Sequence, residues 1–345
     1  MGNLGKKELL ARGLVKTGLI RAVDQYYRWR HHDIKVLAYH RVLPRQPEAG
    51  FPFDLELMSA WQDEFEWQMA FVKRHYDVIS CAQLASLLDA GRWPDRGTAL
   101  ITFDDGFRDN HQYALPVLQR HGLSATIFVT TDYIGTDRHY WFDVLVHDLL
   151  HTRATHLSLG PGQEDVAVGP SEAERRALSD QLLRRAKRLP NTRREQQIAE
   201  WRAQLAVGPQ PGVDYRVHQP MGWDEVRALV AGGLEVGSHT VSHPVLPQVE
   251  SDDDLRRELL QSKQTLESGL GRPVIALAYP TGGPGAYSER VITMAKEVGY
   301  RFAFIYPTGI NGRQQWSPYE IGRRSVERYT SRERFVATLA APDVF

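Results

Sequence analysis

Short apolar runs alternate with segments of helical periodicity along most of the chain. Because the runs contain few polar positions, they indicate strands buried on both faces, as in a parallel sheet or barrel. We expect strands at residues 34–39, 99–103, 125–130, 234–238, 274–279, 301–306 and 321–326. The apolar spacing predicts helices at residues 223–231, 252–268 and 288–298, each followed directly by a glycine. This order of elements predicts a β/α architecture.

A polar stretch at about residues 151–217 interrupts this alternation. It is rich in arginine, glutamate and glutamine, has helical spacing at residues 173–189 and 195–205, and has proline and glycine clusters at both edges. An insertion of this length between two strands commonly adds a lid or a wall to a site. A surface decoration or an oligomer contact is the alternative. We therefore expect a barrel over residues 34–345 with a mainly helical insertion.

Residues 1–33 differ from the rest because they combine positive charge with apolar residues at roughly helical spacing. A basic amphipathic helix of this kind can lie on an anionic membrane surface. Packing of the same helix on the barrel, with its charges in water, is the alternative interpretation. We expect one N-terminal helix, with peripheral membrane contact through residues 1–32 as a possible role.

Charge and cysteine content narrow the function classes. The 345 residues contain 42 lysines and arginines and 42 aspartates and glutamates, so no net field favours nucleic acid. The single cysteine, Cys81, excludes an internal disulfide and a thiolate-rich metal site. The N-terminus lacks the long apolar core of a signal peptide, and we find no apolar run long enough to cross a bilayer. These features predict a cytoplasmic protein, with attachment to the inner membrane surface compatible with the basic N-terminus.

Two adjacent carboxylates follow the second expected strand, in Thr-Phe-Asp-Asp-Gly ending at Gly106. The carboxyl ends of barrel strands form the active-site face, so Asp104 and Asp105 would both lie there. Neighbouring carboxylates repel each other, and a bound cation removes that repulsion, which leaves one acid free to act as a base. An ordinary Asp-Gly turn is the alternative explanation of the same residues.

Two further motifs also follow expected strands. The sequence Gly-Ser-His-Thr-Val-Ser-His-Pro places His239 and His243 four residues apart. Two imidazoles and one carboxylate leave an open position on a metal, which is the catalytic pattern for zinc. The loop Tyr-Pro-Thr-Gly-Gly, which contains Thr281, can present a backbone N–H to an oxyanion, although a simple strand-to-helix turn also explains it.

In this order, the three motifs resemble those of the polysaccharide deacetylases, the carbohydrate esterases with a NodB-homology domain. The segment Val-Leu-Ala-Tyr-His-Arg-Val at 36–42 and Trp-Phe-Asp at 141–143 are similar to a branch of that family. The resemblance covers most of residues 34–330. It implies a deformed (β/α) barrel that holds one divalent metal ion, commonly zinc.

The resemblance also implies roles for individual residues. Asp104 matches the catalytic base and Asp105 the metal-binding aspartate. His239 and His243 match the two metal-binding histidines. Thr281 occupies the position whose backbone amide helps to bind the oxyanion.

The chain departs from the family pattern at two positions. Ala278 replaces an arginine that holds the base in many members, and no histidine follows His243 to serve as the late general acid. We interpret Arg323 as a candidate orienting or oxyanion-stabilising group. His40, at the end of the first expected strand, is the candidate acid, with a structural hydrogen-bonding role as the alternative.

Together these residues predict metal-dependent hydrolysis of an N-acetyl group on a sugar in a polysaccharide, an oligosaccharide or a lipid-linked glycan. A deformylase, an esterase on an O-acetyl substrate and a catalytically silent carbohydrate-binding protein are the alternatives. Aromatic side chains commonly pack in cores, but some could face a sugar. The candidates are Tyr140, Trp141, Tyr279 and Trp316.

Overall fold

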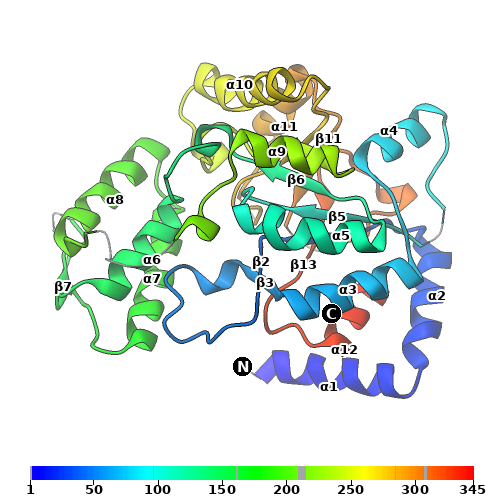
Figure 1. Cartoon of the computed structure of the whole chain (residues 1–345), viewed down its shortest axis with the longest axis horizontal. Helices are drawn as coiled ribbons and strands as arrows, with labels where there is room; N and C mark the ends of the chain where they lie inside the picture. Colours follow the sequence, from blue (N-terminus) through cyan, green and yellow to red (C-terminus); the bar gives the residue numbers. More distant parts are fainter. Residues whose placement is uncertain (1, 96, 161, 209–214, 284, 307–308) are drawn as a thin grey trace.

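A parallel sheet curved into a barrel forms the centre of the fold (Figure 1). The computed structural model describes residues 2–95, 97–160, 162–208, 215–283, 285–306 and 309–345. Within this part of the chain the sheet has nine strands, in the order β12-β11-β10-β9-β6-β5-β1-β13, with β4 paired to the start of β5. Their bounds are β1 (Lys35–Tyr39), β4 (Asp77–Val78), β5 (Thr98–Phe103), β6 (Thr126–Val129), β9 (Glu235–Ser238), β10 (Ala276–Ala278), β11 (Phe302–Ile305), β12 (Ile321–Gly322) and β13 (Arg324–Ser325).

The segment 321–325 closes the barrel. β12 pairs with β11 at one end of the sheet, and β13 pairs with β1 at the other end. Only Arg323 separates these two short strands in the sequence. The single strand expected at residues 321–326 is therefore wrong in detail, because the chain must turn at Arg323 to pair on both sides.

Both faces of the strands are buried, which explains their continuous apolar sequences. Val36, Leu100 and Phe128 belong to one apolar cluster, while Leu37 and Ile101 belong to another that includes residues of the surrounding helices. Side chains alternate between the faces of a strand, so the first cluster fills the barrel and the second lies under the helices. The helices of this outer layer are α3 (Gln62–His75), α5 (Leu115–His121), α9 (Trp223–Ala231), α10 (Asp252–Leu270) and α11 (Glu289–Val298), whereas α4 (Cys81–Asp89) packs against the first cluster.

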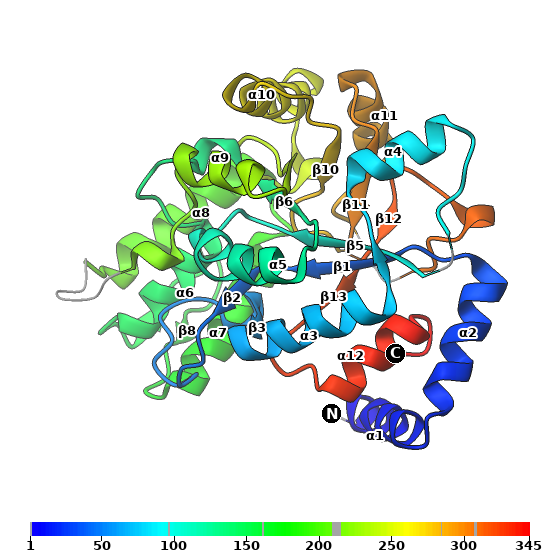
Figure 2. The same cartoon turned by 45° about the vertical axis from the view of Figure 1, so that its right-hand side comes forward.

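The N-terminal segment forms two helices, which corrects the expectation of one. α1 (Gly2–Lys16) and α2 (Leu19–His31) meet at Gly18, whose φ of 75° is the left-handed conformation that ends helices. Ala11 and Ile20 are buried against Ala337 and Ala340 of α12 (Arg332–Ala340). Figure 2 shows α1, α2 and α12 side by side at one end of the molecule.

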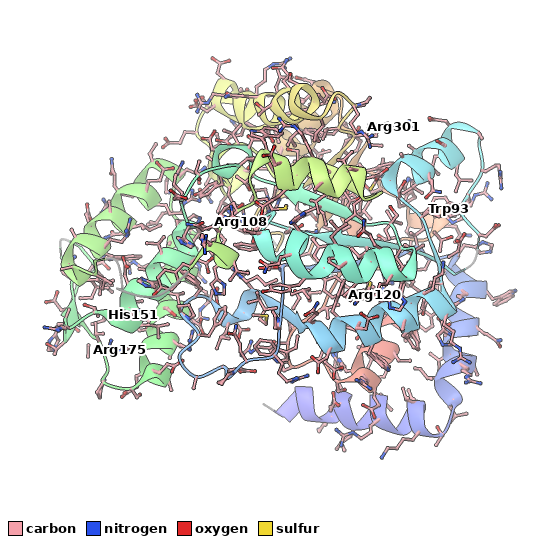
Figure 3. The ribbon with its side chains drawn as sticks, viewed as in Figure 1. Trp93, Arg108, Arg120, His151, Arg175 and Arg301 are labelled. Carbon is pink, nitrogen blue, oxygen red and sulfur yellow. The ribbon has the colours of Figure 1, made fainter. Side chains whose placement is uncertain are left out.

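The insertion is mainly helical, as the sequence predicts, and it has its own apolar cluster around Trp201. It packs on α6 (Trp141–His151) and consists of the hairpin β7 (His156–Leu157) and β8 (Val166–Ala167) with helices α7 (Glu172–Ala186) and α8 (Asn191–Leu205). Arg175 of α7, labelled near His151 in Figure 3, donates hydrogen bonds to the carbonyls of Leu149, Leu150 and Thr152. These bonds satisfy carbonyls that the end of α6 leaves without partners, so they hold the insertion against the barrel.

A separate parallel pair, β2 (Arg41–Leu43) and β3 (Met58–Trp61), continues the chain beyond β1. None of the helices in the described ranges is both long and apolar enough to cross a bilayer.

Candidate active site

One pocket at the carboxyl ends of the strands contains six of the seven residues expected from the sequence, and the seventh, Arg323, contacts one of them. The pocket has a volume of about 160 Å³. Its lining consists of His40, Asp54, Leu57, Asp104, Asp105, Phe142, Lys187, His239, His243, Thr281 and Tyr306. His40, Asp104 and His239 each follow directly after a strand, on β1, β5 and β9. Parallel strands place these strand ends at the same edge, so residues far apart in the sequence meet there.

Asp105, His239 and His243 form a group with ligand atoms within 4.8 Å of one another. Oδ1 of Asp105 lies 3.5 Å from Nε2 of His239 and 3.3 Å from Nε2 of His243. That oxygen and Nδ1 of His243 are buried without a hydrogen-bond partner among the described residues. Buried polar atoms seldom lack partners, and one carboxylate with two imidazoles is a common zinc donor set. The three residues therefore fit a divalent metal ion.

The surrounding structure orients these ligands. Nδ1 of His239 donates to the carbonyl of Ala278 at 2.8 Å, which leaves Nε2 as the nitrogen with a free lone pair. The Tyr140 hydroxyl donates to the backbone carbonyl of Asp105 at 2.5 Å. Glu258 of α10 accepts hydrogen bonds from the N–H groups of Val241 and Ser242, between the two histidines.

Charge favours a cation at this position. Burial would raise the pKa of Asp105, but the close imidazoles of His239 and His243 hold it well below its ordinary value. Burial lowers the pKa of His243 to about 4, so its ring is neutral at pH 7, as a metal ligand must be. Burial also opposes protonation of His239, yet Asp105 and Asp104 raise its pKa overall. The same two carboxylates would stabilise a metal cation in place of that proton.

Strained backbone also marks this site. Asp105, Thr240, His243 and Thr281 have φ values of 69°, 70°, 61° and 65°. Residues with side chains seldom adopt this left-handed conformation, and where they do the surrounding structure must hold them in it. The two other described non-glycine residues with positive φ both follow the ends of helices. The surrounding structure therefore holds these pocket residues in a strained conformation, which sets the directions of their side chains.

Arg323 contacts Asp104 from the point where the barrel closes. Its Nη1 and Nη2 donate to the two carboxylate oxygens at 2.7 and 2.8 Å. Both side chains are buried. Burial raises the pKa of Asp104, but the charge of Arg323 outweighs it, and the net pKa lies below the ordinary value. Asp104 is therefore ionised at neutral pH while it lies beside the three candidate metal ligands.

Tyr306 is a pocket residue that the sequence interpretation missed. Its hydroxyl lies 2.9 Å from Nδ1 of His40, and the two rings stack with centroids 5.5 Å apart. Burial lowers the pKa of His40, and the charges of Asp105 and Asp104 oppose this shift. Tyr306 ends one of the expected strands, so its position at a strand end was the available signal. Asp54, Leu57 and Lys187 had no such signal, because they lie outside the expected strands.

Thr281 lines the pocket, and its backbone N–H has no acceptor among the described residues. The next residue, Gly282, has a φ of 56°, and a Cβ there would lie 2.2 Å from Cδ2 of Tyr306. Only glycine allows Tyr306 to approach this closely. The third motif therefore shapes the pocket around both Thr281 and Tyr306.

The four aromatic residues considered for sugar contact do not line this pocket. Tyr140 and Tyr279 are buried, and the Tyr279 hydroxyl donates to the carbonyl of Tyr319. Trp316 packs against Phe302 at the start of β11, away from the active-site edge. Trp141 packs against the cluster of the insertion. The expectation is therefore wrong for the buried Tyr140 and Tyr279, whereas sugar contact by the half-buried Trp141 and Trp316 stays a prediction. Phe142 and Tyr306 are the aromatic rings that line the pocket.

The insertion contributes directly to the pocket through Lys187, which follows α7. Asn191, at the start of α8, forms hydrogen bonds with both backbone groups of Val245, near His243. In the described residues the insertion is therefore a wall of the site.

Comparisons with known proteins agree with this geometry. A family model described as polysaccharide deacetylase matches residues 92–303, more than half of the chain. The Bacillus subtilis polysaccharide deacetylase homologue YxkH is 38% identical over 77 residues, which cover 22% of this chain and 28% of that protein. The Staphylococcus epidermidis poly-β-1,6-N-acetyl-D-glucosamine N-deacetylase is 25% identical over 125 residues, 34% of this chain and 43% of that protein. The matches thus span less than half of the length of either relative.

A solved structure confirms the expected fold. The deacetylase PplD of Streptococcus pyogenes, in complex with acetate, superposes with a TM-score of 0.57 at 19% identity. The superposition covers 89% of this chain and 98% of that chain. The resemblance and the deformed barrel expected from the sequence are thus both confirmed. The chain belongs to the polysaccharide deacetylase family.

Proposed function

We propose that this protein hydrolyses the N-acetyl group of an N-acetylated sugar in a glycan, with the help of one divalent metal ion, zinc being our expectation. The main support is a single arrangement: Asp104, fixed by Arg323, lies beside the Asp105–His239–His243 group in one pocket. A free carboxylate next to a complete metal-ligand set is what this hydrolysis needs. A carbohydrate-binding protein without catalysis would have no use for that combination.

Asp105, His239 and His243 would hold the metal ion. When bound, the ion supplies a Lewis acid that polarises the amide carbonyl and lowers the pKa of water. The remaining chemistry belongs to side chains and backbone groups of the chain.

Asp104 acts as the general base that takes the proton of the attacking water. Because Arg323 lowers its pKa, Asp104 is already ionised at neutral pH, as a base must be. The two hydrogen bonds from Arg323 also prevent the carboxylate from rotating. We infer that Arg323 is a positioning residue and performs the function that Ala278 cannot perform.

The backbone N–H of Thr281 stabilises the oxyanion that forms on the attacked carbon. A free backbone donor beside the reacting group needs no reorganisation during the reaction. The leaving nitrogen must also gain a proton. In our proposal the protonated form of His40, which the charges of Asp105 and Asp104 favour, supplies it and becomes neutral, and Tyr306 positions the imidazole. The proton taken by Asp104 is the alternative source.

The relatives that match this chain guide the choice of substrate. One of them is a poly-β-1,6-N-acetyl-D-glucosamine N-deacetylase. We propose a polymer or oligomer of N-acetylated sugars as the substrate class of this chain as well. Lys187 and Asp54 line the pocket, so they offer charged groups for contacts with sugar hydroxyls.

Incubation with N-acetylated oligosaccharides, followed by mass spectrometry, tests the proposal. The wild-type protein should release acetate, and Asp104→Asn should retain metal but lose nearly all turnover. Loss of mass only from N-formyl or O-acetyl compounds would move the protein to the deformylase or esterase alternative. Binding of the oligosaccharides without any change in their mass would contradict catalysis, and wild-type acetate release by Asp104→Asn would contradict the base.

A further inference from the structure

Large exposed apolar side chains concentrate on the two N-terminal helices. In the described part of the chain seven such residues are strongly exposed, and five of them lie on α1 and α2: Leu9, Leu10, Leu19, Tyr26 and Trp29. Leu9 is 70% exposed and Trp29 is 61% exposed. Exposure of leucine and tryptophan side chains to water is energetically unfavourable. A cluster of such exposed side chains therefore marks an interaction surface.

The sequence spacing places these residues on defined helix faces. Leu19, Ala22, Tyr26 and Trp29 are separated by three, four and three residues, so they form one stripe along α2. All four are exposed, and the Tyr26 and Trp29 rings lie 6.5 Å apart. The opposite side of α2 contains Ile20, which packs on α12. The stripe is therefore not needed for packing on the barrel.

Positive charge exceeds negative charge around this stripe, although Asp343 lies beside Tyr27 of α2. The acidic residues of the two helices are Glu8 and Asp24, and both form ion pairs with arginines within the same helix, Arg12 and Arg28. Lys6, Lys7, Lys16, Arg21 and Arg30 have no ion pair among the described residues and carry the remaining charge, all positive. Leu9 shares its exposed face of α1 with Lys6 and Lys16, and Tyr26 shares its face of α2 with Arg30.

A neighbouring hollow extends the positive field. It has a volume of about 520 Å³ between α1, α2, α3 and α12, with an apolar lining that includes Trp67 and Phe71. Lys16, Arg21 and His75 also line it, together with one acidic residue, Asp24. Burial lowers the pKa of His75, and the nearby charges of Arg74, Arg28 and Arg21 lower it further. Positive charge is therefore dense on this side of the protein.

We propose that α1 and α2 dock the protein on an anionic lipid bilayer surface, with Leu19, Tyr26 and Trp29 inserted among the headgroups. Tryptophan and tyrosine favour the membrane interface because their rings are apolar with one polar atom. Lysine and arginine beside them attract anionic lipids, at about 1 kcal/mol or roughly fivefold in partition for each residue. Apolar and cationic groups on the same helix faces match both properties of that surface.

The fold places α2 at the opposite end of the barrel from the active site. α2 leads into the start of β1, whereas His40 and the other pocket residues follow the strand ends. Both views show α2 and the insertion on opposite sides of the molecule (Figures 1 and 2). A protein docked through α2 would thus hold its pocket away from the bilayer, open to a glycan in the surrounding solution.

Sedimentation of the full chain with phospholipid vesicles tests the proposal. We expect binding to phosphatidylcholine vesicles that contain phosphatidylglycerol, weak binding to pure phosphatidylcholine and loss of binding at high salt. The triple variant Lys6→Gln, Lys16→Gln and Arg30→Gln should bind roughly a hundredfold more weakly, from about fivefold per charge. The variant Leu19→Ser, Tyr26→Ser and Trp29→Ser should lose binding even to anionic vesicles.

Matched controls separate this surface from general effects. Tyr329, 54% exposed, is an apolar residue outside the two helices, so Tyr329→Ser should bind like the wild type. Arg92→Gln removes an exposed charge near α4 and serves as the charge control. Each variant should fold like the wild type, because the altered side chains are exposed. Circular dichroism checks this expectation.

Three results would overturn the proposal. The first is a wild-type protein that does not bind anionic vesicles, and the second is undiminished binding by the serine variant. The third is a wild-type dimer that ignores vesicles and becomes monomeric in the serine variant, which would assign the surface to a second copy of the chain.

Discussion

Replacement of Arg323 by methionine should destabilise the protein by about 3–5 kcal/mol, because it would leave Asp104 buried without its cation. Arg323 is fully buried and the Asp104 side chain is 2% exposed, so solvent would screen the unpaired charge only weakly. The substitution removes two charge-assisted hydrogen bonds, at 2.7 and 2.8 Å, and leaves both carboxylate oxygens without that donor.

The reasoning also predicts the behaviour of the double variant. Asp104→Asn in the Arg323→Met background removes the unpaired charge, and an apolar replacement of a buried pair is often close to neutral. The double variant should therefore recover about 2 kcal/mol relative to Arg323→Met alone.

Urea unfolding followed by circular dichroism measures these differences, with a chelator present so that metal binding does not contribute. Arg332 and Glu64 provide a matched control, because their two hydrogen bonds, at 3.0 and 3.2 Å, join side chains that are 52% and 32% exposed. Arg332→Met should cost no more than about 1 kcal/mol. If Arg323→Met also lost less than that, or if the double variant recovered nothing, the pair would not carry the stability that its burial implies.

Four further outcomes are expected. A chelator should abolish acetate release and added zinc or cobalt should restore it, whereas full activity in metal-free protein would remove the metal from the mechanism. His40→Asn should slow N-acetyl hydrolysis by about 10²–10⁴-fold but spare an aryl acetate, whose leaving group needs no proton; equal losses on both substrates would indicate a structural role. Gly282→Ala should displace Tyr306 and lower kcat, whereas Gly283→Ala, whose added Cβ would have its nearest neighbour 3.7 Å away, should not; equal kcat values would contradict this. Burial raises the pKa of Asp109 to about 7, so the contribution of Asp109 to stability should fall as pH rises from about 4 to 7, and over this range the wild type should lose about 4 kcal/mol relative to Asp109→Asn in urea titrations; parallel pH profiles would refute the shift.

The sign of the Asp109 effect follows from its surroundings. Arg41 is buried between two carboxylates, with Nη2 bonded to Asp143 at 2.5 Å and Nη1 3.5 Å from Asp109. One guanidinium cannot neutralise both acids, so the folded protein retains a proton that the unfolded chain releases near pH 4. Loss of that proton as the pH rises therefore destabilises the fold.

Much of the fold could be predicted from local patterns. The expected helix at residues 223–231 has the bounds of α9, and six of the seven expected strands form single strands within a residue or two of their predicted ends. Local patterns suffice here because buried parallel strands and amphipathic helices impose different periods on apolar residues. The break at Gly18 was not predicted, because apolar spacing continues across it.

Most of the pocket could also be predicted, because Asp104, His239 and His40 each follow directly after a strand. The pairing of Arg323 with Asp104 joins residues 219 positions apart, and that of Tyr306 with His40 joins residues 266 apart. Neither contact could be predicted from the spacing of residues along the sequence. Lys187 and Asp54 depend on the packing of the insertion and of the long loop after β2.

The sequence alone determined the positions of most barrel strands, the candidate metal ligands and the candidate base, because each is encoded in a few adjacent residues whose backbone geometry is local. Closure of the barrel decided the rest. It brings the segment around Arg323 between β11 and β1, and only there can its guanidinium reach the carboxylate of Asp104. How the base is held is therefore a property of the closed sheet, since no local motif contains both partners.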